Sequence, residues 1–214
     1  MKYRITIAVL LLFLSCGEQK PEVKSEMKEK PEKVKLMTLD PGHFHAALVQ
    51  KTMYPQVDST IYLYAPKGPE AKDFIRKIKS YNSREVEPTQ WKIEINFTND
   101  SLNKTIADKP GDVMVLAGKN SKKIDYILEA VKAGLNVFAD KPLVITKEGF
   151  EKLKEAVQIA DKNDVLIYDI MTERFESTTM MQKLFSSLPS VFGELVDGSI
   201  EEPAISKESV HYFF

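Results

Sequence analysis

Hydrophobic and polar positions alternate along the chain in two periods between residues 34 and 170. Short apolar runs predict strands, and segments with apolar residues three or four positions apart predict helices. The predicted strands are Val34–Leu39, Thr60–Tyr64, Trp91–Phe97, Val113–Ala117, Leu135–Ala139 and Val165–Ile170. The helices predicted between them are Phe44–Met53, Glu70–Tyr81, Leu102–Ala107, Ser121–Ala133 and Lys147–Lys162. This alternation indicates an α/β fold, a doubly wound parallel sheet over residues 34–171 with helices on both faces.

Two details of the pattern define the ends of its last helices. Gly134 can take the left-handed conformation that ends a helix before the next strand. Thr146 is placed to cap the following helix. The face of that helix expected to be buried comprises Phe150, Leu153, Val157 and Ala160.

The alternation of predicted strands and helices ends after Ile170. Residues Thr172–Leu188 predict a connecting helix, and Glu194–Ile200 predict the first strand of another unit. The apolar stripe of the helix, which we expect to be core, comprises Met180, Met181, Leu184, Phe185 and Leu188. The sequence ends on two aromatic residues without evident partners, so we expect residues 172–214 to be the beginning of a truncated second domain.

The N-terminus is typical of a secretion signal. Lys2 and Arg4 precede the apolar run Ile5–Leu14, which is too short for a permanent membrane helix. The junction Leu14-Ser15-Cys16-Gly17 resembles the lipobox of bacterial lipoproteins, although Phe13 stands where that motif usually has leucine. We therefore expect residues 1–16 to be a signal peptide ending at a lipidated Cys16, which anchors an exported protein to a bacterial membrane. Ordinary signal cleavage beside a chance cysteine is the alternative.

The composition predicts a tether after the signal peptide and excludes some classes of site and partner. Residues 17–33 carry five lysines, five glutamates and two prolines, which predicts a solvated tether. Cys16 is the single cysteine, so neither a disulfide nor a cysteine metal site forms within the chain. A hydrophobic content of 43% supports a core, and a net charge of −1 argues against nucleic acid as a partner.

The first predicted strand leads into Asp40-Pro41-Gly42-His43-Phe44-His45, where a dinucleotide-binding fold of the Rossmann type has its turn G-x-G-x-x-G. Only Gly42 matches that motif. The amides of Gly42, His43, Phe44 and His45 can still meet a pyrophosphate, whereas an inward Asp40 would repel it. An adapted and a vestigial nucleotide loop are both consistent with the sequence.

The two histidines of this loop have several uses. They can bind a metal, exchange protons or contact a pyrophosphate, and His45 can also serve only in packing. Two histidines are too few metal ligands, and no nearby carboxylate pair completes the set, so we expect no metal site. The second strand ends Ala65-Pro66-Lys67 without the usual ribose-binding acid, and Lys67 weakly favours NADP if it meets a 2′-phosphate.

Later strands end in further candidate residues. Ala117, Gly118 and Asn120 follow the fourth strand and can line the nucleotide crevice, although Asn120 or Ser121 can equally cap the next helix. Asp140-Lys141-Pro142 follows the fifth strand, where the proline can hold a cis peptide and aim the lysine into the crevice. The alternative interpretation of Asp140-Lys141-Pro142 is a surface turn. Arg174 follows the sixth strand and can reach a substrate or pair with an acid.

The segment DVMVLAGKNSKKIDYILEAVKAGLNVFADKPLVIT, the strand order and the Arg174-Phe175 pair resemble the glucose-fructose oxidoreductase, inositol dehydrogenase and MocA family, Gfo/Idh/MocA. The resemblance covers residues 34–200, with Asp140 where members have glutamate. It implies a Rossmann-like domain that binds NAD or NADP, with Asp140, Lys141 and Pro142 beside the nicotinamide and Lys141 as the catalytic cation. It also implies a second α+β substrate domain, which supplies an acid/base pair and a sheet through which homo-oligomers form.

The resemblance implies an oxidoreductase that transfers hydride between NAD(P) and a sugar or polyol, of which this chain is the nucleotide-binding part and is inactive alone. One alternative is a member that cleaves glycosides by transient oxidation. The other is an exported binding protein that kept the fold and lost its cofactor. The reduced glycine loop and the missing ribose acid favour the latter.

Overall fold

The computed structural model describes residues 32–171, 174–194 and 196–204. The predicted signal peptide, Cys16 and the tether as far as Pro31 lie outside the described residues. None of the helices in the described ranges is long and apolar enough to cross a membrane.

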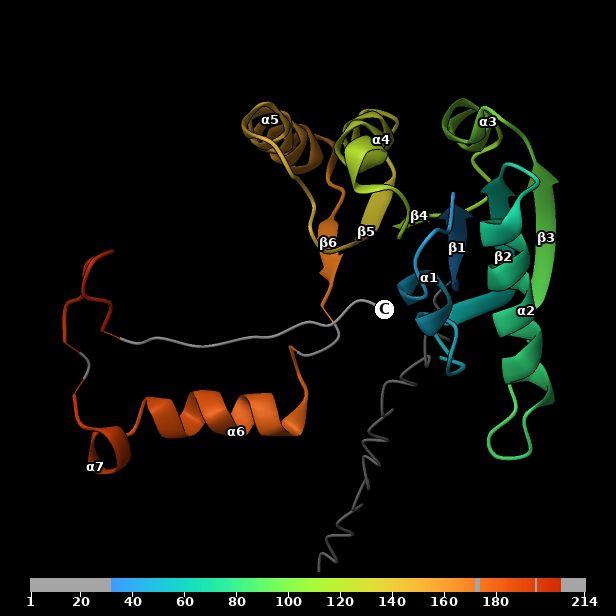
Figure 1. The fold of residues 1–214 in the computed structure, drawn as a ribbon. Coiled ribbons are helices and arrows are strands. Elements are labelled where there is room, and N and C mark those ends of the chain that lie inside the picture. The colour runs from blue at the N-terminus through green and yellow to red at the C-terminus, as the bar shows by residue number, and fades with distance from the viewer. Residues whose placement is uncertain (1–31, 172–173, 195, 205–214) are drawn as a thin grey trace, which may run out of the picture. The chain divides into compact units, whose positions relative to one another are not determined.

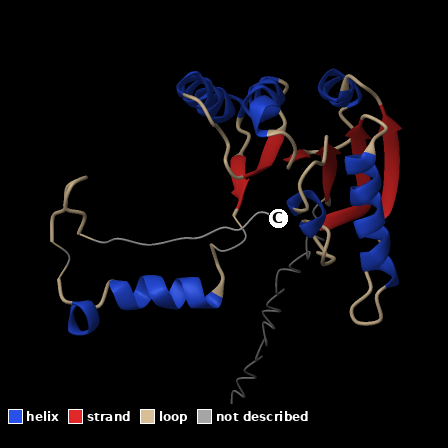
Figure 2. Ribbon diagram, viewed as in Figure 1, coloured by secondary structure: helices blue, strands red, loops and turns tan. Residues whose placement is uncertain are grey.

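Six parallel strands form one sheet in the order β3-β2-β1-β4-β5-β6 (Figures 1 and 2). The strands are β1 (Val34–Leu39), β2 (Val57–Ala65), β3 (Lys92–Phe97), β4 (Val113–Leu116), β5 (Asn136–Asp140) and β6 (Ile167–Ile170). This order reverses direction between β1 and β4, which is the place where doubly wound sheets open a crevice at the carboxyl ends of their strands. The predicted Rossmann-like α/β fold is confirmed.

Five helices accompany the sheet. They are α1 (His45–Leu48), α2 (Pro69–Ser83), α3 (Ser101–Asp108), α4 (Asn120–Lys132) and α5 (Lys147–Asn163). Helices α3, α4 and α5 lie on one face and α1 and α2 on the other (Figure 1). Gly134 follows α4 with φ +69°, as the sequence predicts for a left-handed helix end.

Alternate residues of the central strands pack into two hydrophobic cores, one on each face of the sheet. Met37, Leu39 and Met114 are buried against α4 and α5, while Ile61 and Leu63 are buried with α2 on the opposite face. Strands that are buried on both faces have continuous apolar sequences, and this is why they could be predicted from the sequence.

Helix α1 is a single turn, shorter than the predicted Phe44–Met53. The indole Nε1 of Trp91 donates to the Gln50 carbonyl at 2.6 Å, and that carbonyl is therefore engaged where a longer helix would need it. The chain turns at Gln50 and Lys51, whose amides donate to Ala47 and Leu48 three residues back. Helix α1 thus gives way to these turns before it reaches the carbonyl that Trp91 binds.

Helix α5 confirms its predicted cap and corrects its predicted face. Thr146 Oγ1 accepts from the Gly149 amide at 3.0 Å. The buried residues are Gly149, Ala156 and Ala160, whereas Phe150 and Val157 are exposed. Leu153 and Ala160 of the predicted face do pack on the core, so the prediction is wrong only for Phe150 and Val157.

Two further helices, α6 (Ser177–Ser186) and α7 (Pro189–Phe192), follow the sheet. The predicted core stripe is wrong for the described chain, because every one of its side chains is exposed. The stripe comprises Met180, Met181, Leu184, Phe185 and Leu188. The strand predicted at Glu194–Ile200 is also wrong for residues 194 and 196–200, which are not in a strand and have no neighbouring strand among the described residues to pair with.

Candidate functional site

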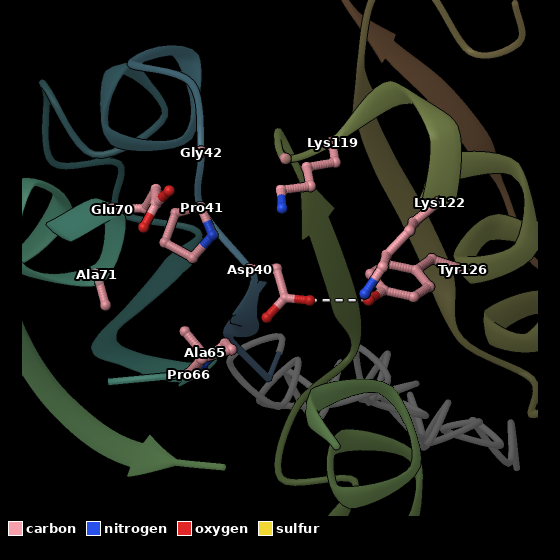
Figure 3. Close-up of a pocket in the computed structure, with 11 residues that line it drawn as sticks. Asp40, Pro41, Gly42, Ala65, Pro66, Glu70, Ala71, Lys119, Lys122 and Tyr126 are labelled. Carbon is pink, nitrogen blue, oxygen red and sulfur yellow. Dashed lines mark hydrogen bonds between the residues drawn. The ribbon is translucent and has the colours of Figure 1, made fainter. Parts of the chain in front are cut away.

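A pocket of about 440 Å³ opens at the carboxyl edge of the sheet, at the reversal between β1 and β4 (Figure 3). Its volume lies within the range of small-molecule sites. The lining residues are Asp40, Pro41, Gly42, Ala65, Pro66, Glu70, Ala71, Gly118, Lys119, Lys122 and Tyr126. They come from the ends of β1, β2 and β4 and from the starts of α2 and α4, the position of the nucleotide crevice in doubly wound sheets.

The loop between β1 and α1 closes on β4. The amides of Gly42 and His43 both donate to the Ala117 carbonyl, at 3.0 and 2.7 Å. We expected these amides to be available to a pyrophosphate, and the structure instead engages them within the protein. Gly42 and Gly118 do line the pocket, while Ala117 holds the loop in place from below.

Asp40 is the acidic residue of this loop. Its Oδ2 accepts from the Tyr126 hydroxyl at 2.8 Å (Figure 3). Burial raises the pKa of Tyr126, so this phenol stays protonated and donates. The other carboxylate oxygen, Oδ1, is buried and has no hydrogen-bond partner within the described part of the chain. The pocket therefore carries a fixed carboxylate where the dinucleotide motif has its first glycine.

Positive charge enters the pocket from α4. Lys119 and Lys122 line it, and both side chains are exposed (Figure 3). Lys67 is exposed after Pro66 and is not among the lining residues. The pocket fits a dinucleotide in place and size. Lys119 and Lys122 are charged groups that can neutralise a pyrophosphate here, and a role for the amides of Phe44 and His45 stays a prediction.

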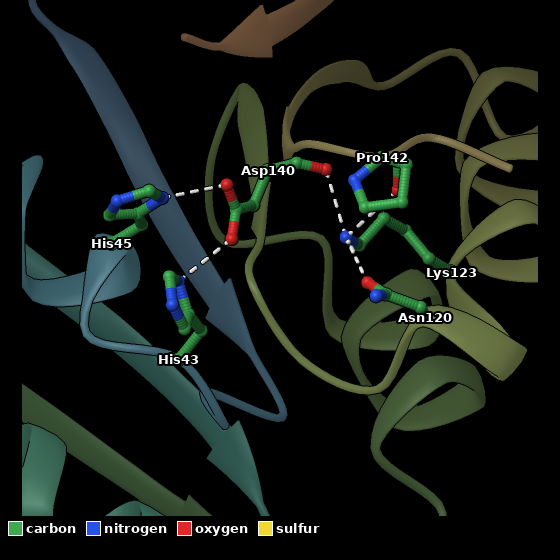
Figure 4. Close-up of polar contacts among 6 residues, drawn as sticks. All are labelled: His43, His45, Asn120, Lys123, Asp140 and Pro142. Carbon is green, nitrogen blue, oxygen red and sulfur yellow. Dashed lines mark hydrogen bonds and ion pairs between the residues drawn. The ribbon is translucent and has the colours of Figure 1, made fainter. Parts of the chain in front are cut away.

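Asp140-Lys141-Pro142 lies at the end of β5, as predicted, with a cis peptide between Lys141 and Pro142. The Lys141 side chain is exposed. The backbone around it is held by Lys123, whose Nζ donates to the carbonyls of Asp140 at 2.8 Å and Pro142 at 3.1 Å (Figure 4). Lys123 thereby fixes the segment that presents Lys141.

Lys123 is a residue that sequence reasoning missed. It is 2% exposed, and burial lowers its pKa. Its third acceptor is Asn120 Oδ1 at 2.8 Å, so Asn120 holds this lysine and does not cap α4, which begins without a side-chain cap. The sequence signal that could have identified Lys123 is its helical position. It lies four residues before the buried Ile127 and therefore on the inner face of α4.

Asp140 also contacts both histidines of the first loop (Figure 4). His45 Nδ1 lies 2.7 Å from Oδ1, and His43 Nδ1 lies 2.9 Å from Oδ2. Only the His45 contact has hydrogen-bond geometry. Burial lowers the pKa of His43, so its imidazole is neutral near pH 7. The sequence analysis found no third group for these histidines, and the fold supplies one from the end of β5.

Arg174 lies at the start of the segment after β6. Its guanidinium donates to both carboxylate oxygens of Asp169, at 2.7 and 2.6 Å, and lies 5.7 Å from the centre of the Tyr168 ring. This is the ion pair that the sequence left open as an alternative. A substrate role for Arg174 stays a prediction, as do the assigned roles of Phe44, which is exposed, and of Lys141.

Comparisons with known proteins place these features in a family. Residues 41–170 match the family described as "Oxidoreductase family, NAD-binding Rossmann fold", Gfo/Idh/MocA. Residues 181–214 match the "Putative oxidoreductase C terminal domain". A comparison with curated proteins gives no match.

Solved structures agree. A putative oxidoreductase from Parabacteroides merdae is 48% identical with a TM-score of 0.77, covering 81% of this chain and 39% of that chain. A putative oxidoreductase from Thermotoga maritima is 20% identical, with a TM-score of 0.56 over 74% of this chain and 45% of that one. The WlbA dehydrogenase from Bordetella pertussis, solved with NADH and UDP-GlcNAcA, is 15% identical, with a TM-score of 0.52 over 75% of this chain and 41% of that one.

The last two likenesses show the fold alone, and the chain spans less than half the length of each of these three proteins. The family follows from the match over residues 41–170 and from the 48% identity to the Parabacteroides protein. The predicted cofactor class, NAD or NADP, is that of this family. The chain belongs to the Gfo/Idh/MocA oxidoreductases and carries their NAD-binding Rossmann fold.

Proposed function

We propose that this chain is the nucleotide-binding part of an exported, lipid-anchored oxidoreductase that transfers hydride between NAD(P) and a carbon of a sugar or polyol. The observation that carries the proposal is the position of Asp140-Lys141-Pro142 at the end of β5, at the same sheet edge as the pocket between β1 and β4. A cofactor lying along this edge can reach from the pocket to Lys141.

The pocket would hold the cofactor through its walls and its lysines. When bound, the nicotinamide accepts or donates the hydride. Gly42 and Gly118 leave the wall without side chains, and Lys119 and Lys122 supply charge opposite the pyrophosphate. No acid ends β2, so we leave the choice between NAD and NADP to measurement.

Lys141 would orient the substrate oxygen and stabilise negative charge on it. A lysine ammonium is a compact charge that suits an oxygen acquiring alkoxide character. Lys123 is a positioning residue in this scheme, because it binds the carbonyls on either side of Lys141 without facing the pocket itself.

A sugar is the substrate class we favour. The fold relative from Bordetella pertussis was solved with a nucleotide-linked sugar, UDP-GlcNAcA, together with NADH. The lipobox-like sequence around Cys16 supports a site outside the cytoplasm, where sugars and polyols reach the protein without uptake. Residues 181–214 match an oxidoreductase C-terminal domain, and the chain covers 39% of the Parabacteroides relative, so we propose that substrate contacts come from a C-terminal domain.

Two observations favour a second candidate, a binding protein without redox activity. The amides of Gly42 and His43 are engaged by Ala117, and the Asp40 carboxylate stands in the pocket. Both features weaken a pyrophosphate site. A ligand with hydroxyl or amine donors would suit Asp40 better than an anion does.

Titration of the purified chain with NADH and NADPH, followed by nicotinamide fluorescence, separates the two candidates. The oxidoreductase requires saturable binding of at least one of them. The protein extended past residue 214 should then reduce NAD or NADP when incubated with a panel of sugars and polyols. A folded chain that binds neither nucleotide would contradict the proposal and favour the binding protein.

A further inference from the structure

The cluster formed by His43, His45 and Asp140 has no assigned role in the scheme above. Each residue offers one ligand atom, and these atoms all lie within 4.8 Å of one another. We propose that the three side chains form a binding site for one divalent transition-metal ion. The inference rests on the arrangement of these three side chains and does not require the proposed hydride transfer.

The contacts within the cluster are only half explained by hydrogen bonds. His45 Nδ1 and Asp140 Oδ1 form one at 2.7 Å. His43 Nδ1 lies 2.9 Å from Oδ2 without hydrogen-bond geometry, and this buried nitrogen has no other partner in the described ranges. A cation bound by both imidazoles and the carboxylate would give His43 Nδ1 a partner and would take the place of the proton between His45 and Asp140, because metal ligands lie about 3 Å apart around an ion at about 2 Å.

The backbones that carry the ligands are held in place. The His43 amide donates to the Ala117 carbonyl at 2.7 Å. His45 begins α1 and is buried there. Lys123 Nζ binds the backbone carbonyl of Asp140 at 2.8 Å, which fixes the end of β5 and leaves the carboxylate to the histidines. Ligands fixed in this way bind an ion without first paying the entropy of assembly.

The donor set indicates the class of ion. Two imidazoles and one carboxylate suit Zn²⁺, Co²⁺, Fe²⁺ or Ni²⁺, whereas Mg²⁺ and Ca²⁺ prefer oxygen ligands throughout. The side chains of His45 and Asp140 are 7% and 5% exposed, while that of His43 is 39% exposed. The ion would therefore be reached from the His43 side, where water or a ligand can occupy the coordination position that three protein ligands leave open.

The site is tested with the whole chain, stripped of metal by a chelator and titrated with Zn²⁺ by calorimetry and with Co²⁺ by visible absorption. We expect one bound ion per chain. We also expect the Co²⁺ titration to give the visible absorption spectrum of a Co²⁺ ion that is surrounded by few ligands. His43→Gln and Asp140→Asn should each weaken binding by about 100-fold or more, since even residues behind the ligands contribute 10 to 100-fold. Circular dichroism checks that each variant is folded.

A matched control removes the single cysteine and the third histidine of the chain. Cys16 and His211 lie outside the described residues, and the double variant Cys16→Ser, His211→Gln should keep full Zn²⁺ affinity. If Asp140→Asn does not fold, His43→Gln decides alone, because its half-exposed side chain can be replaced without opening the core. A folded wild type that binds no stoichiometric ion, or binds it equally well in His43→Gln, would overturn the site. NADH titration of the same metal-free sample reports on the proposed function separately.

Discussion

Gly118 lies so close to Asp40 that a Cβ atom on residue 118 would stand 2.3 Å from the Asp40 carbonyl oxygen. No side chain is tolerated at that distance from backbone, so the loops after β1 and β4 meet directly. The absence of a side chain at Gly118 sets the shape of the pocket wall that both loops form.

Gly118→Ala should therefore move the β1 loop and destabilise the fold. We expect the free energy of unfolding to fall by about 1–3 kcal/mol, the usual cost of overpacking a tight contact. Gly42→Ala is the matched control, because its Cβ would meet Gly118 Cα at 3.5 Å, an ordinary contact, and should change stability by less than about 0.5 kcal/mol. Urea denaturation measures both variants, and equal losses would show that the close approach is not the cause.

Asp40→Asn should tighten nucleotide binding. The substitution removes a negative charge from the pocket, and asparagine tolerates the left-handed backbone of this residue, φ 43°. We expect the Kd for NADH to fall by about fivefold, equivalent to ~1 kcal/mol for one charge at close range in a wet site. Tyr126→Phe removes the hydrogen bond and keeps the charge, so it should not tighten binding. A Kd that Asp40→Asn leaves unchanged would place the carboxylate away from the pyrophosphate.

The fold could be predicted because it rests on local patterns. Strands such as β4, buried on both faces, are apolar throughout, and the helices between them repeat with the helical period. The same local reasoning failed for α1, which ends at Leu48, two residues before the Gln50 carbonyl that binds Trp91, 41 residues further along the chain. It failed for the stripe of α6 because an amphipathic pattern shows that a face is apolar and does not show what covers it.

The sequence named candidate residues for the site, but it did not predict the contacts between them. The sequence placed His45 and Asp140 at the ends of two different strands, and only the sheet order brings them together across 95 residues. The use of the Gly42 amide by Ala117 is likewise a tertiary contact with no sequence signature. Lys123 was not among the residues that the sequence singled out, because the three oxygens that surround it come from different segments of the chain.

Lys123→Met tests how far that buried lysine supports the site. Methionine fills a similar volume but leaves the carbonyls of Asp140 and Pro142 without their donor. We expect unfolding to become easier by about 1–3 kcal/mol, the cost of buried acceptors without partners. Lys122→Met, at the exposed neighbouring position, should change stability by less than about 0.5 kcal/mol. Thermal and urea unfolding give the comparison, and equal stability of the two variants would contradict it.

Cys16→Ser tests the lipid anchor. We expect the wild type in the membrane fraction of a bacterial host and the variant in the soluble fraction, because durable anchoring needs the acyl chains that the cysteine carries. Ser25→Thr, which lies in the predicted tether and keeps the lipobox-like junction intact, serves as a control. Cell fractionation and the mass of the mature N-terminus report the outcome. Membrane association that survives the loss of Cys16 would rule out the lipoprotein assignment.

Lys141→Ala distinguishes an enzyme from a binding protein in the version of the protein extended past residue 214. Lys141 is exposed at the end of β5, and its loss should leave the Kd for NADH within a few-fold. Turnover on the responsive sugar should fall by about a hundredfold or more, the scale of losing one fixed electrostatic contact to the reacting oxygen. Lys141→Arg should not restore full turnover, since a broad guanidinium cannot take the place of a compact ammonium.

Lys147→Ala is the control for Lys141→Ala, because it removes an equally exposed lysine from the first turn of α5 and should leave turnover unchanged. Steady-state kinetics must separate kcat from KM. A loss confined to KM would indicate that Lys141 binds substrate without stabilising the transition state. Wild-type turnover in Lys141→Ala would exclude the lysine from the chemistry, and the catalytic cation would then have to be sought among residues outside this chain.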